Sequence, residues 1–235
     1  MTFNEDSLSP GVAVILVAAG RGRRLGSEIP KQYIPLDGAC ALRRSAARFL
    51  SVEGIGRVLP VIHPDDRALC ETALDGLDDP RLMAPVSGGG TRAASVKKGL
   101  EALETHRPFK VLIHDAARPF VPVRVVEDVI AALNEAEGAF AALQVVDALW
   151  TAEASDALSP VPREGLWRAQ TPQGFDFAKI LEAHRAHDGA GADDVVVARE
   201  AGMRVRIVPG AEQNYKITTR ADLERALRDL RTDHG

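Results

Sequence analysis

The chain has 235 residues, which suffices for one large α/β domain, and we expect residues 1–235 to form a single domain. Apolar residues make up 46% and charged residues 26% of it, as is typical of a soluble globular protein. The net charge of −4 argues against a nucleic-acid partner, and the lack of any apolar run near ~18 residues argues against a membrane span.

The N-terminal segment, MTFNEDSLSP, is polar and acidic, unlike a secretory signal peptide. The two cysteines, Cys40 and Cys70, are far apart and lack the spacing of metal ligands, so we expect reduced thiols. Together these observations favour a cytoplasmic protein.

An apolar, β-type run over residues 12–17 leads into a loop of small and basic residues. From Val14 to Tyr33 the sequence reads VILVAAGRGRRLGSEIPKQY. Small residues let the backbone approach a ligand closely, and exposed N–H groups bind anions. The arginines and Lys31 add the positive charge of a polyphosphate clamp. This loop therefore indicates chemistry on a nucleoside triphosphate.

Two other interpretations of the loop are weaker. A dinucleotide-binding fingerprint needs G-x-G-x-x-G directly before a helix, but here the third glycine, Gly26, comes one residue late. Pro30 also disfavours immediate entry into a long helix. A plain surface turn with solvated arginines is the other alternative. The full pattern, A-A-G-x-G-x-R with P-K-Q downstream, is more specific than a glycine-rich loop alone.

Strand-like and helical patterns alternate along the rest of the chain. Predicted strands cover 12–17, 56–62, 111–114 and 204–208, the last as an inner strand, with a short strand at 81–86. Predicted helices cover 41–50, 64–77, 91–104, 176–187 and 192–201, and two more begin at Pro122 and at a capping box of Thr219 and Asp222. This alternation predicts a mostly parallel sheet with helices on both faces. Ligands bind beyond the carboxyl ends of such strands, where the glycine loop and His114-Asp115 fall.

The pattern changes between residues 139 and 173. Strand-like runs at 141–146 and 165–170 flank a polar, proline-containing segment at 150–163. We expect a β-arm that projects from the sheet over about residues 140–170. An exposed arm with an unpaired edge tends to find a partner, so the sequence predicts a homodimer through this arm.

Five local patterns then resemble one family. They are AAGRGRRLGSEIPKQY, SGGGTRAASV, HDAARPFV, GLWRAQTPQGF and NYKITTRADL. In this order and spacing, from about Val12 to Leu230, the chain resembles the 2-C-methyl-D-erythritol 4-phosphate cytidylyltransferase family of the non-mevalonate isoprenoid pathway. The resemblance implies a Rossmann-like, three-layer nucleotidyltransferase fold with a mostly parallel twisted sheet and a projecting β-arm. It also implies transfer of CMP from CTP to methylerythritol phosphate, with Mg²⁺ as cofactor and pyrophosphate as product.

The resemblance assigns catalytic roles to Arg24, Lys31 and Lys216, which would act on the triphosphate and on the developing charge. Position alone would make Lys216 a solvated surface lysine. The residues that it implies for CTP binding are Ala18, Ala19, Gly20, Gly22, Gly89, Gly90, Arg92, Ser95, Asp115, Ala116 and Arg118. Without the resemblance, residues 87–95 read as a strand-to-helix turn with Thr91 near the cap.

Asp115 is also the predicted metal ligand. It follows a predicted strand, and a carboxylate beside a triphosphate suits Mg²⁺. The alternative is a cap for the following turn. We expect His114 to pack and hydrogen-bond rather than to act as a base, because the attacking phosphate is already anionic.

The acceptor substrate has its own predicted residues. Arg163 and Thr171 match family positions that bind the phosphate of the alcohol, with Arg163 reaching across from the partner's arm. Asp193 matches an acidic residue near the sugar hydroxyls, and a solvated acid at a helix start fits it equally well.

The chain departs from the family pattern on this acceptor side. Ala148 and Ala192 stand where family threonines are expected. A cytidylyltransferase for another polyol phosphate, such as ribitol 5-phosphate, therefore stays open. A non-catalytic nucleotide-binding protein is the alternative of a different class, and the intact Arg24, Lys31, Asp115 and Lys216 argue against it.

Overall fold

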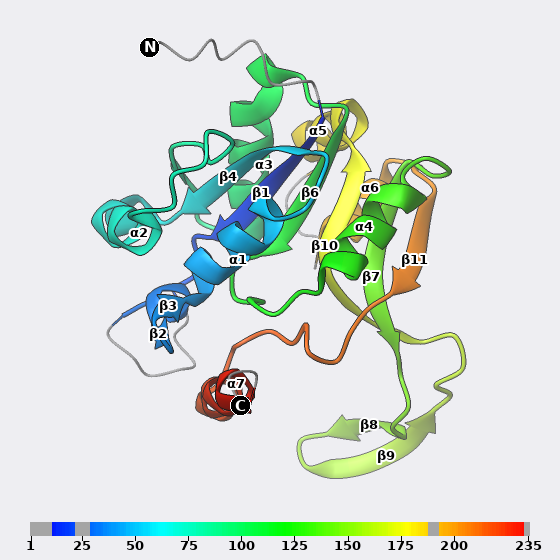
Figure 1. The fold of residues 1–235 in the computed structure, drawn as a ribbon. Helices are drawn as coiled ribbons and strands as arrows, with labels where there is room; N and C mark the ends of the chain where they lie inside the picture. The colour runs from blue at the N-terminus through cyan, green and yellow to red at the C-terminus, as the bar shows by residue number, and fades with distance from the viewer. Residues whose placement is uncertain (1–10, 22–28, 188–192, 233–235) are drawn as a thin grey trace, which may run out of the picture.

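The computed structural model describes residues 11–21, 29–187 and 193–232, and its centre is a seven-stranded sheet. The strands lie in the order β11-β7-β10-β6-β1-β4-β5 (Figure 1). Neighbouring strands run parallel, except that β10 is antiparallel to both β6 and β7. The expected mostly parallel sheet is thereby confirmed. The strand bounds are β1 (Val12–Ala18), β4 (Ile55–Ile62), β5 (Val86–Ser87), β6 (Lys110–Asp115), β7 (Gly138–Gln144), β10 (Trp167–Asp176) and β11 (Val205–Pro209).

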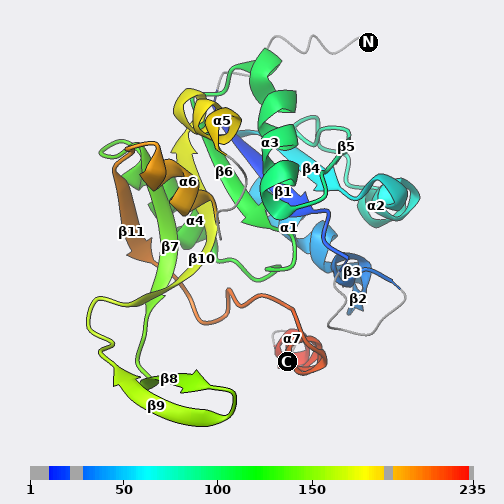
Figure 2. The ribbon, with the colours of Figure 1, turned by 180° about the vertical axis from the view of Figure 1, so that it is seen from behind.

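Helices cover both faces of the sheet, which is why its inner strands are apolar on both sides (Figures 1 and 2). Val14 and Leu16 of β1 share one core with α1 and α4, whereas Ala13 and Ile15 share the other with α3, α5 and α6. This alternation gives three layers. The helix bounds are α1 (Ala41–Leu50), α2 (Arg67–Leu74), α3 (Arg92–Leu103), α4 (Val123–Ala132), α5 (Phe177–Ala186), α6 (Asp194–Glu200) and α7 (Arg220–Thr232).

Two predicted strands and one predicted helix differ from the structure. Within 81–86, Leu82 makes an isolated β-bridge with Val58, and only Val86 belongs to a strand, β5; Pro85, between them, has no N–H to donate to a ladder. The strand predicted at 204–208 is not an inner strand: it is β11, at the sheet edge, where Ile207 is exposed. The helix predicted over 64–77 is divided into a 3₁₀ turn, Pro64–Asp66, and α2.

The projecting arm is present. Beyond β7, the chain forms a separate two-stranded hairpin of β8 (Leu149–Glu153) and β9 (Asp156–Val161), and it returns to the sheet as β10. Both ribbon views show this hairpin extending away from the three layers (Figures 1 and 2). Trp150 and Leu158, one on each strand, are exposed over 58% and 60% of their surfaces. The arm thus carries apolar side chains that its own chain leaves uncovered.

The C-terminal helix α7 forms a third, smaller core below the sheet. Ala226 and Leu230 pack there with Leu36 and Ile217. The predicted capping box is confirmed, because the Thr219 N–H donates to Asp222 Oδ2 (2.8 Å) and the Asp222 N–H donates to Thr219 Oγ1 (3.2 Å). This start of α7 fixes the segment that precedes it. Among the described helices, none combines the length and apolar character that a membrane span requires.

Candidate active site

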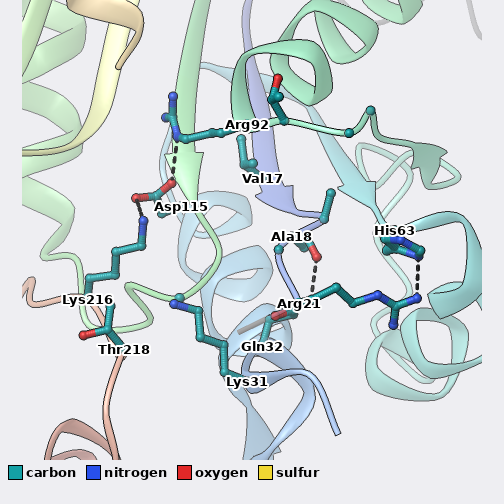
Figure 3. A pocket seen from close by; sticks show the side chains of 16 residues that line it. Val17, Ala18, Arg21, Lys31, Gln32, His63, Arg92, Asp115, Lys216 and Thr218 are labelled. Carbon is teal, nitrogen blue, oxygen red and sulfur yellow. Dashed lines mark hydrogen bonds and ion pairs between the residues drawn. The ribbon is translucent and has the colours of Figure 1, made fainter. Parts of the chain in front are cut away.

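A cavity of about 590 Å³ opens beyond the carboxyl ends of β1 and β6 (Figure 3). This is the edge of the sheet that the strand pattern predicts for ligand binding. The segments that line it come from the glycine loop, the turn before α3, the end of β6 and the segment before α7. The lining residues are Val17, Ala18, Ala19, Gly20, Arg21, Lys31, Gln32, His63, Gly89, Gly90, Thr91, Arg92, Asp115, Ala117, Lys216 and Thr218.

A second, smaller cavity of about 200 Å³ adjoins the first. Three residues, Arg92, Asp115 and Lys216, line both cavities. We call these three residues the shared wall. The other residues of the second cavity are Arg118, Ala169, Gln170, Thr171, Gln173 and Asp193.

Asp115 is the centre of the shared wall. Its Oδ2 lies 2.8 Å from Lys216 Nζ, and its Oδ1 accepts a hydrogen bond from Arg92 Nε at 3.3 Å. Arg118 Nε lies 3.7 Å from Oδ2. Burial would raise the pKa of Asp115, but the charges of Lys216, Arg92 and Arg118 outweigh it and hold that pKa well below its usual value. Asp115 is therefore a carboxylate at any physiological pH.

Arg92 connects the wall to a second carboxylate. Its Nη1 lies 2.8 Å from Oδ2 of Asp194, a side chain that is only 1% exposed. Burial would lower the pKa of Arg92, whereas the charges of Asp194 and Asp115 raise it overall. The guanidinium is consequently held between two carboxylates from different elements.

A buried hydrogen-bond network fixes the end of β6. The Asp115 N–H donates to Thr171 Oγ1 (3.1 Å), and the same hydroxyl lies 3.0 Å from His114 Nδ1. His114 Nε2 lies 3.1 Å from the carbonyl oxygen of Arg118. Burial lowers the pKa of His114 to about 4, so the imidazole is neutral at neutral pH. His114 thus packs and hydrogen-bonds here, as expected.

Lys216 is positioned by two amide side chains that the sequence analysis did not single out. Asn214 Nδ2 donates to the Thr171 carbonyl (2.8 Å) and to Gln170 Oε1 (3.2 Å). Gln170 also donates to the carbonyl oxygen of Ala211 (2.9 Å). Both residues lie in the family-like patterns GLWRAQTPQGF and NYKITTRADL, which was the available signal. They attach the Lys216 segment to the middle of β10.

Lys31 reaches the first cavity from the short 3₁₀ helix that follows the glycine loop. Its Nζ donates to the carbonyl oxygen of Ile217 (2.8 Å), next to Lys216, so the two lysines lie on one side of the cavity (Figure 3). Gln32 anchors this helix by donating to the Ala18 carbonyl (2.6 Å). Ala18, Ala19 and Gly20 line the cavity beside it.

Arg21, one of the arginines of the predicted polyphosphate clamp, lines the first cavity and also pairs with acidic residues. Its guanidinium donates to Asp66 (2.9 Å) and Asp65 (2.6 Å) and lies 2.7 Å from His63 Nδ1. Figure 3 shows Arg21 and His63 opposite the two lysines. Two further residues of the predicted loop, Gly22 and Arg24, lie outside the described residues.

The glycine turn before α3 agrees with both interpretations of residues 87–95, as a ligand-binding turn and as a strand-to-helix turn with a cap. Gly89 and Gly90 line the first cavity, while Thr91 caps α3 by accepting the N–H of Ala94 (3.1 Å). A Cβ on Gly89 would stand 2.5 Å from the Ala94 Cβ, so the turn requires glycine there. Ser95 lies buried beneath it and accepts the Gly89 N–H (3.0 Å) rather than lining the cavity.

The remaining predicted residues are divided between the cavity walls and other places. Thr171 and Asp193 line the second cavity, and Asp193 also caps α6 by accepting the Val196 N–H (3.2 Å). Ala116 is buried in the core, and its neighbour Ala117 lines the first cavity instead. Arg163 lies on the arm, where it donates to the Val146 carbonyl, and lines neither cavity. Ala148 is exposed at the base of the arm, and Ala192 lies outside the described residues.

Asp115, the predicted metal ligand, shares the second cavity with the carboxylate of Asp193. Within the described ranges, no group of three or more His, Cys, Asp or Glu side chains is arranged to hold a metal ion. A cation at the shared wall would therefore need ligands from a bound molecule.

Comparison with known proteins places the chain among nucleotidyltransferases. The family model for 2-C-methyl-D-erythritol 4-phosphate cytidylyltransferase (IspD) matches residues 12–231. The chain is 52% identical over 224 residues to the bifunctional enzyme IspD/IspF of Rhodobacter capsulatus, covering 95% of this chain but only 57% of that protein. It is 49% identical over 218 residues to the 2-C-methyl-D-erythritol 4-phosphate cytidylyltransferase of Cereibacter sphaeroides, covering 93% of this chain and 96% of that one.

A solved structure agrees with these sequence relatives. The crystal structure of 4-diphosphocytidyl-2C-methyl-D-erythritol synthase from Anaerococcus prevotii superposes with a TM-score of 0.81. The two chains are 26% identical, and the match covers 94% of this chain and 98% of that one. The three-layer fold is thus similar over almost the full length of that protein.

Proposed function

Because the chain belongs to the 2-C-methyl-D-erythritol 4-phosphate cytidylyltransferase family, we propose that it transfers CMP from CTP to 2-C-methyl-D-erythritol 4-phosphate. The products are 4-diphosphocytidyl-2-C-methyl-D-erythritol and pyrophosphate. The observation that carries this proposal is the pair of adjoining cavities with one shared wall. A transferase of this kind must hold two substrates whose phosphates meet at one place.

CTP fits the larger cavity. Its volume of about 590 Å³ lies within the range of ~300–1,000 Å³ that is common for ligand sites. The backbone of Gly89 and Gly90 can contact the base, and Gly20 with Lys31 can contact the triphosphate. The smaller, polar cavity suits a polyol phosphate, with Arg118 for the phosphate and Asp193 for hydroxyl groups.

The reaction is an in-line displacement at the α-phosphorus of CTP. A phosphate oxygen of the acceptor forms the new P–O bond, and the bond to the β-phosphate breaks. Negative charge then increases on the transferred phosphoryl group and on pyrophosphate, where Lys31, Lys216 and Arg92 can stabilise it. The attacking oxygen is already anionic, so no general base is needed, in keeping with the neutral, buried His114.

Mg²⁺ is the proposed cofactor, with Asp115 as its protein ligand. Mg²⁺ sites often use one or two carboxylates together with substrate phosphates and water. Asp115 fits this requirement, since its carboxyl group stays ionised and lies where the two cavities meet. The bound ion would neutralise part of the charge on the triphosphate.

We also propose a homodimer that forms through the arm. The exposed Trp150 and Leu158 on the β8–β9 hairpin offer apolar surface to a second copy. In such a dimer, Arg163 would leave its own chain's surface and reach the smaller cavity of the partner.

The two cysteines, Cys40 and Cys70, are buried free thiols, which supports a reducing compartment and hence the cytoplasm.

The deciding experiment measures pyrophosphate release with CTP and Mg²⁺, with either methylerythritol 4-phosphate or ribitol 5-phosphate as acceptor. We expect fast release only with methylerythritol 4-phosphate. Release only with ribitol 5-phosphate would assign the chain to another acceptor and make Ala148 and Ala192 the leading explanation. If neither acceptor supports release while CTP still binds, the proposed activity is wrong and a nucleotide-binding protein replaces it.

A further inference from the structure

A line of alternating charges runs from the shared wall into the protein interior. It starts at Lys216, passes through Asp115 and Arg92, and reaches Asp194, whose Oδ2 lies 2.8 Å from Arg92 Nη1. The line then continues for one more residue. Asp194 Oδ1 lies 3.2 Å from Nε2 of His184, on α5.

His184 is polar and buried, and it lies outside both cavities. Its side chain is 3% exposed, and the helix that carries it contributes mainly apolar side chains to the core between α3, α5 and α6. Among the described residues, His184 Nε2 makes no hydrogen bond, and its close contact is with the Asp194 carboxylate, which is itself 1% exposed and lies 3.2 Å away. The contact between them therefore brings together two buried polar side chains.

We propose that His184 is a positioning residue that holds Asp194 and, through it, Arg92 against Asp115. The inference rests on the proposed function, because it concerns the wall where the two substrates would meet. The guanidinium of Arg92 is planar, so its contact with Asp194 through Nη1 sets the direction in which its Nε–H points at Asp115. The 3.2 Å contact with His184 Nε2 limits where the second carboxylate oxygen of Asp194 can lie.

The contact between His184 and Asp194 also affects the smaller cavity, through the backbone of Asp194. The Asp194 N–H donates to Gln173 Oε1 (3.1 Å), and Gln173 Nε2 donates to Asp193 Oδ2 (3.2 Å). Gln173 and Asp193 both line the smaller cavity. Displacement of Asp194 would thus disturb the acceptor cavity as well as the shared wall.

The chemistry of imidazole suits this role. The Nε2 atom carries a proton in the charged form and in one neutral tautomer, so it can face the Asp194 carboxylate with an N–H in either charge state. A glutamine side chain can present an N–H at a similar reach, whereas methionine has a similar size and no donor. Comparing these two replacements separates the effect of losing the N–H donor from the effect of changing the size of the side chain.

The test compares His184→Met with His184→Gln, and uses His187→Met as a matched control. His187 lies at the end of the same helix but pairs with Glu200, away from Asp194. We expect His184→Met to lower kcat by roughly 10-fold or more, since small displacements at a reacting centre have effects of this order. His184→Gln should retain most of kcat, and His187→Met should match the wild-type protein.

Binding and stability are measured alongside turnover. The affinity for CTP with Mg²⁺, obtained by calorimetry, should change less than kcat in His184→Met, because Lys31 and the glycine turn still contact the nucleotide. Equal losses in His184→Met and His184→Gln, each with a lowered Tm, would reduce His184 to a packing residue. Wild-type turnover in His184→Met would also overturn the proposal.

A spectroscopic measurement separates this inference from the proposed function. The side-chain Nε–H resonance of Arg92, recorded by ¹⁵N-edited NMR, reports its contact with Asp115 whether or not the protein turns over any substrate. It should shift or broaden in His184→Met and stay near its wild-type position in His184→Gln. An unchanged Arg92 signal in both variants would contradict the positioning role of His184, even if the wild-type protein proves active.

Discussion

Lys31 and Lys216 reach one cavity from opposite ends of the chain, and they differ in how readily the sequence reveals them. Lys31 belongs to a dense pattern of glycine, arginine and lysine after a strand. Lys216 has no such surroundings, and only the resemblance of NYKITTRADL to a family pattern singles it out. The structure pairs Lys216 with Asp115 at 2.8 Å, which local composition could not indicate.

At this scale we predict the effect of Lys31→Ala. Removal of the ammonium group should lower kcat by about 10²–10³-fold, because one charged donor to the developing charge is lost. The fold should survive, since the lysine lines a cavity rather than the core. Pyrophosphate release and the thermal unfolding midpoint measure the two effects.

Lys97→Ala is the matched control for that prediction. Lys97 lies on α3 and lines neither cavity, so its removal should leave kcat within about twofold of the wild-type value. Near-wild-type turnover in Lys31→Ala would contradict the assignment of the first cavity to the triphosphate.

Several residue-level expectations failed to anticipate side-chain partners. Arg21 was expected at a phosphate, but the acidic pair Asp65 and Asp66 lies within reach of it. Ser95 supports the glycine turn from below instead of facing the cavity. Such choices depend on which groups a fold brings together over long sequence distances, and a local motif does not contain that information.

At the scale of single elements, α7 depends on its capping box. Burial raises the pKa of Asp222, but hydrogen bonds from Thr218 and Thr219 outweigh it and lower the pKa to about 2. A carboxyl group with an ordinary pKa near ~3.9 in the unfolded chain then stabilises the fold above about pH 4. This contribution decreases as the pH falls toward 2.

We therefore predict that Asp222→Asn lowers the free energy of unfolding by about 1 kcal/mol at pH 7, as the loss of a helix cap does. At pH 3 the difference from the wild-type protein should be smaller, because the carboxyl group of the unfolded wild-type chain is then mostly protonated while that of the folded chain is still mostly ionised. Urea unfolding at both pH values measures this. Glu224→Gln, on the exposed face of α7, is the control, and a pH-independent difference for Asp222→Asn would contradict the cap assignment.

Elements were predicted best where one physical signal dominated. The helix over 41–50 and the capping box of α7 follow from side-chain periodicity and from local hydrogen bonding, and both match the structure. The strand at 81–86 and the place of β11 did not follow. Pairing in a sheet is decided by which neighbour is available, and β11 reaches the edge only because β7 and β10 lie between it and β6.

At the scale of the whole molecule, the proposed dimer through the arm leads to a prediction about how two subunits complete one active site. If Arg163 acts in the partner's site, a Lys31→Ala chain and an Arg163→Ala chain together restore one complete site in each mixed dimer. A statistical mixture should then regain activity at about a quarter of the sites at low acceptor concentration. Each variant alone should stay impaired, with Arg163→Ala affecting mainly the KM for the acceptor.

The control for that experiment removes the interface. Trp150→Glu with Leu158→Glu places charge on the exposed apolar side chains of the arm and should give monomers in sedimentation velocity. Restoration of activity should disappear with the dimer. A mixture of the two single variants that stays inactive would contradict the assignment of Arg163 to the partner's site.

The position of Asp115 among three cations has a consequence for selectivity. Lys216, Arg92 and Arg118 all lie within 3.7 Å of its carboxylate, which acts as their internal counter-ion. Like charges this close would repel one another without it. Any incoming molecule must therefore compete with one fixed negative charge for these three side chains. A neutral nucleoside or sugar has no negative charge with which to compete with Asp115, whereas a triphosphate has several. The site therefore selects ligands by charge before it selects them by shape.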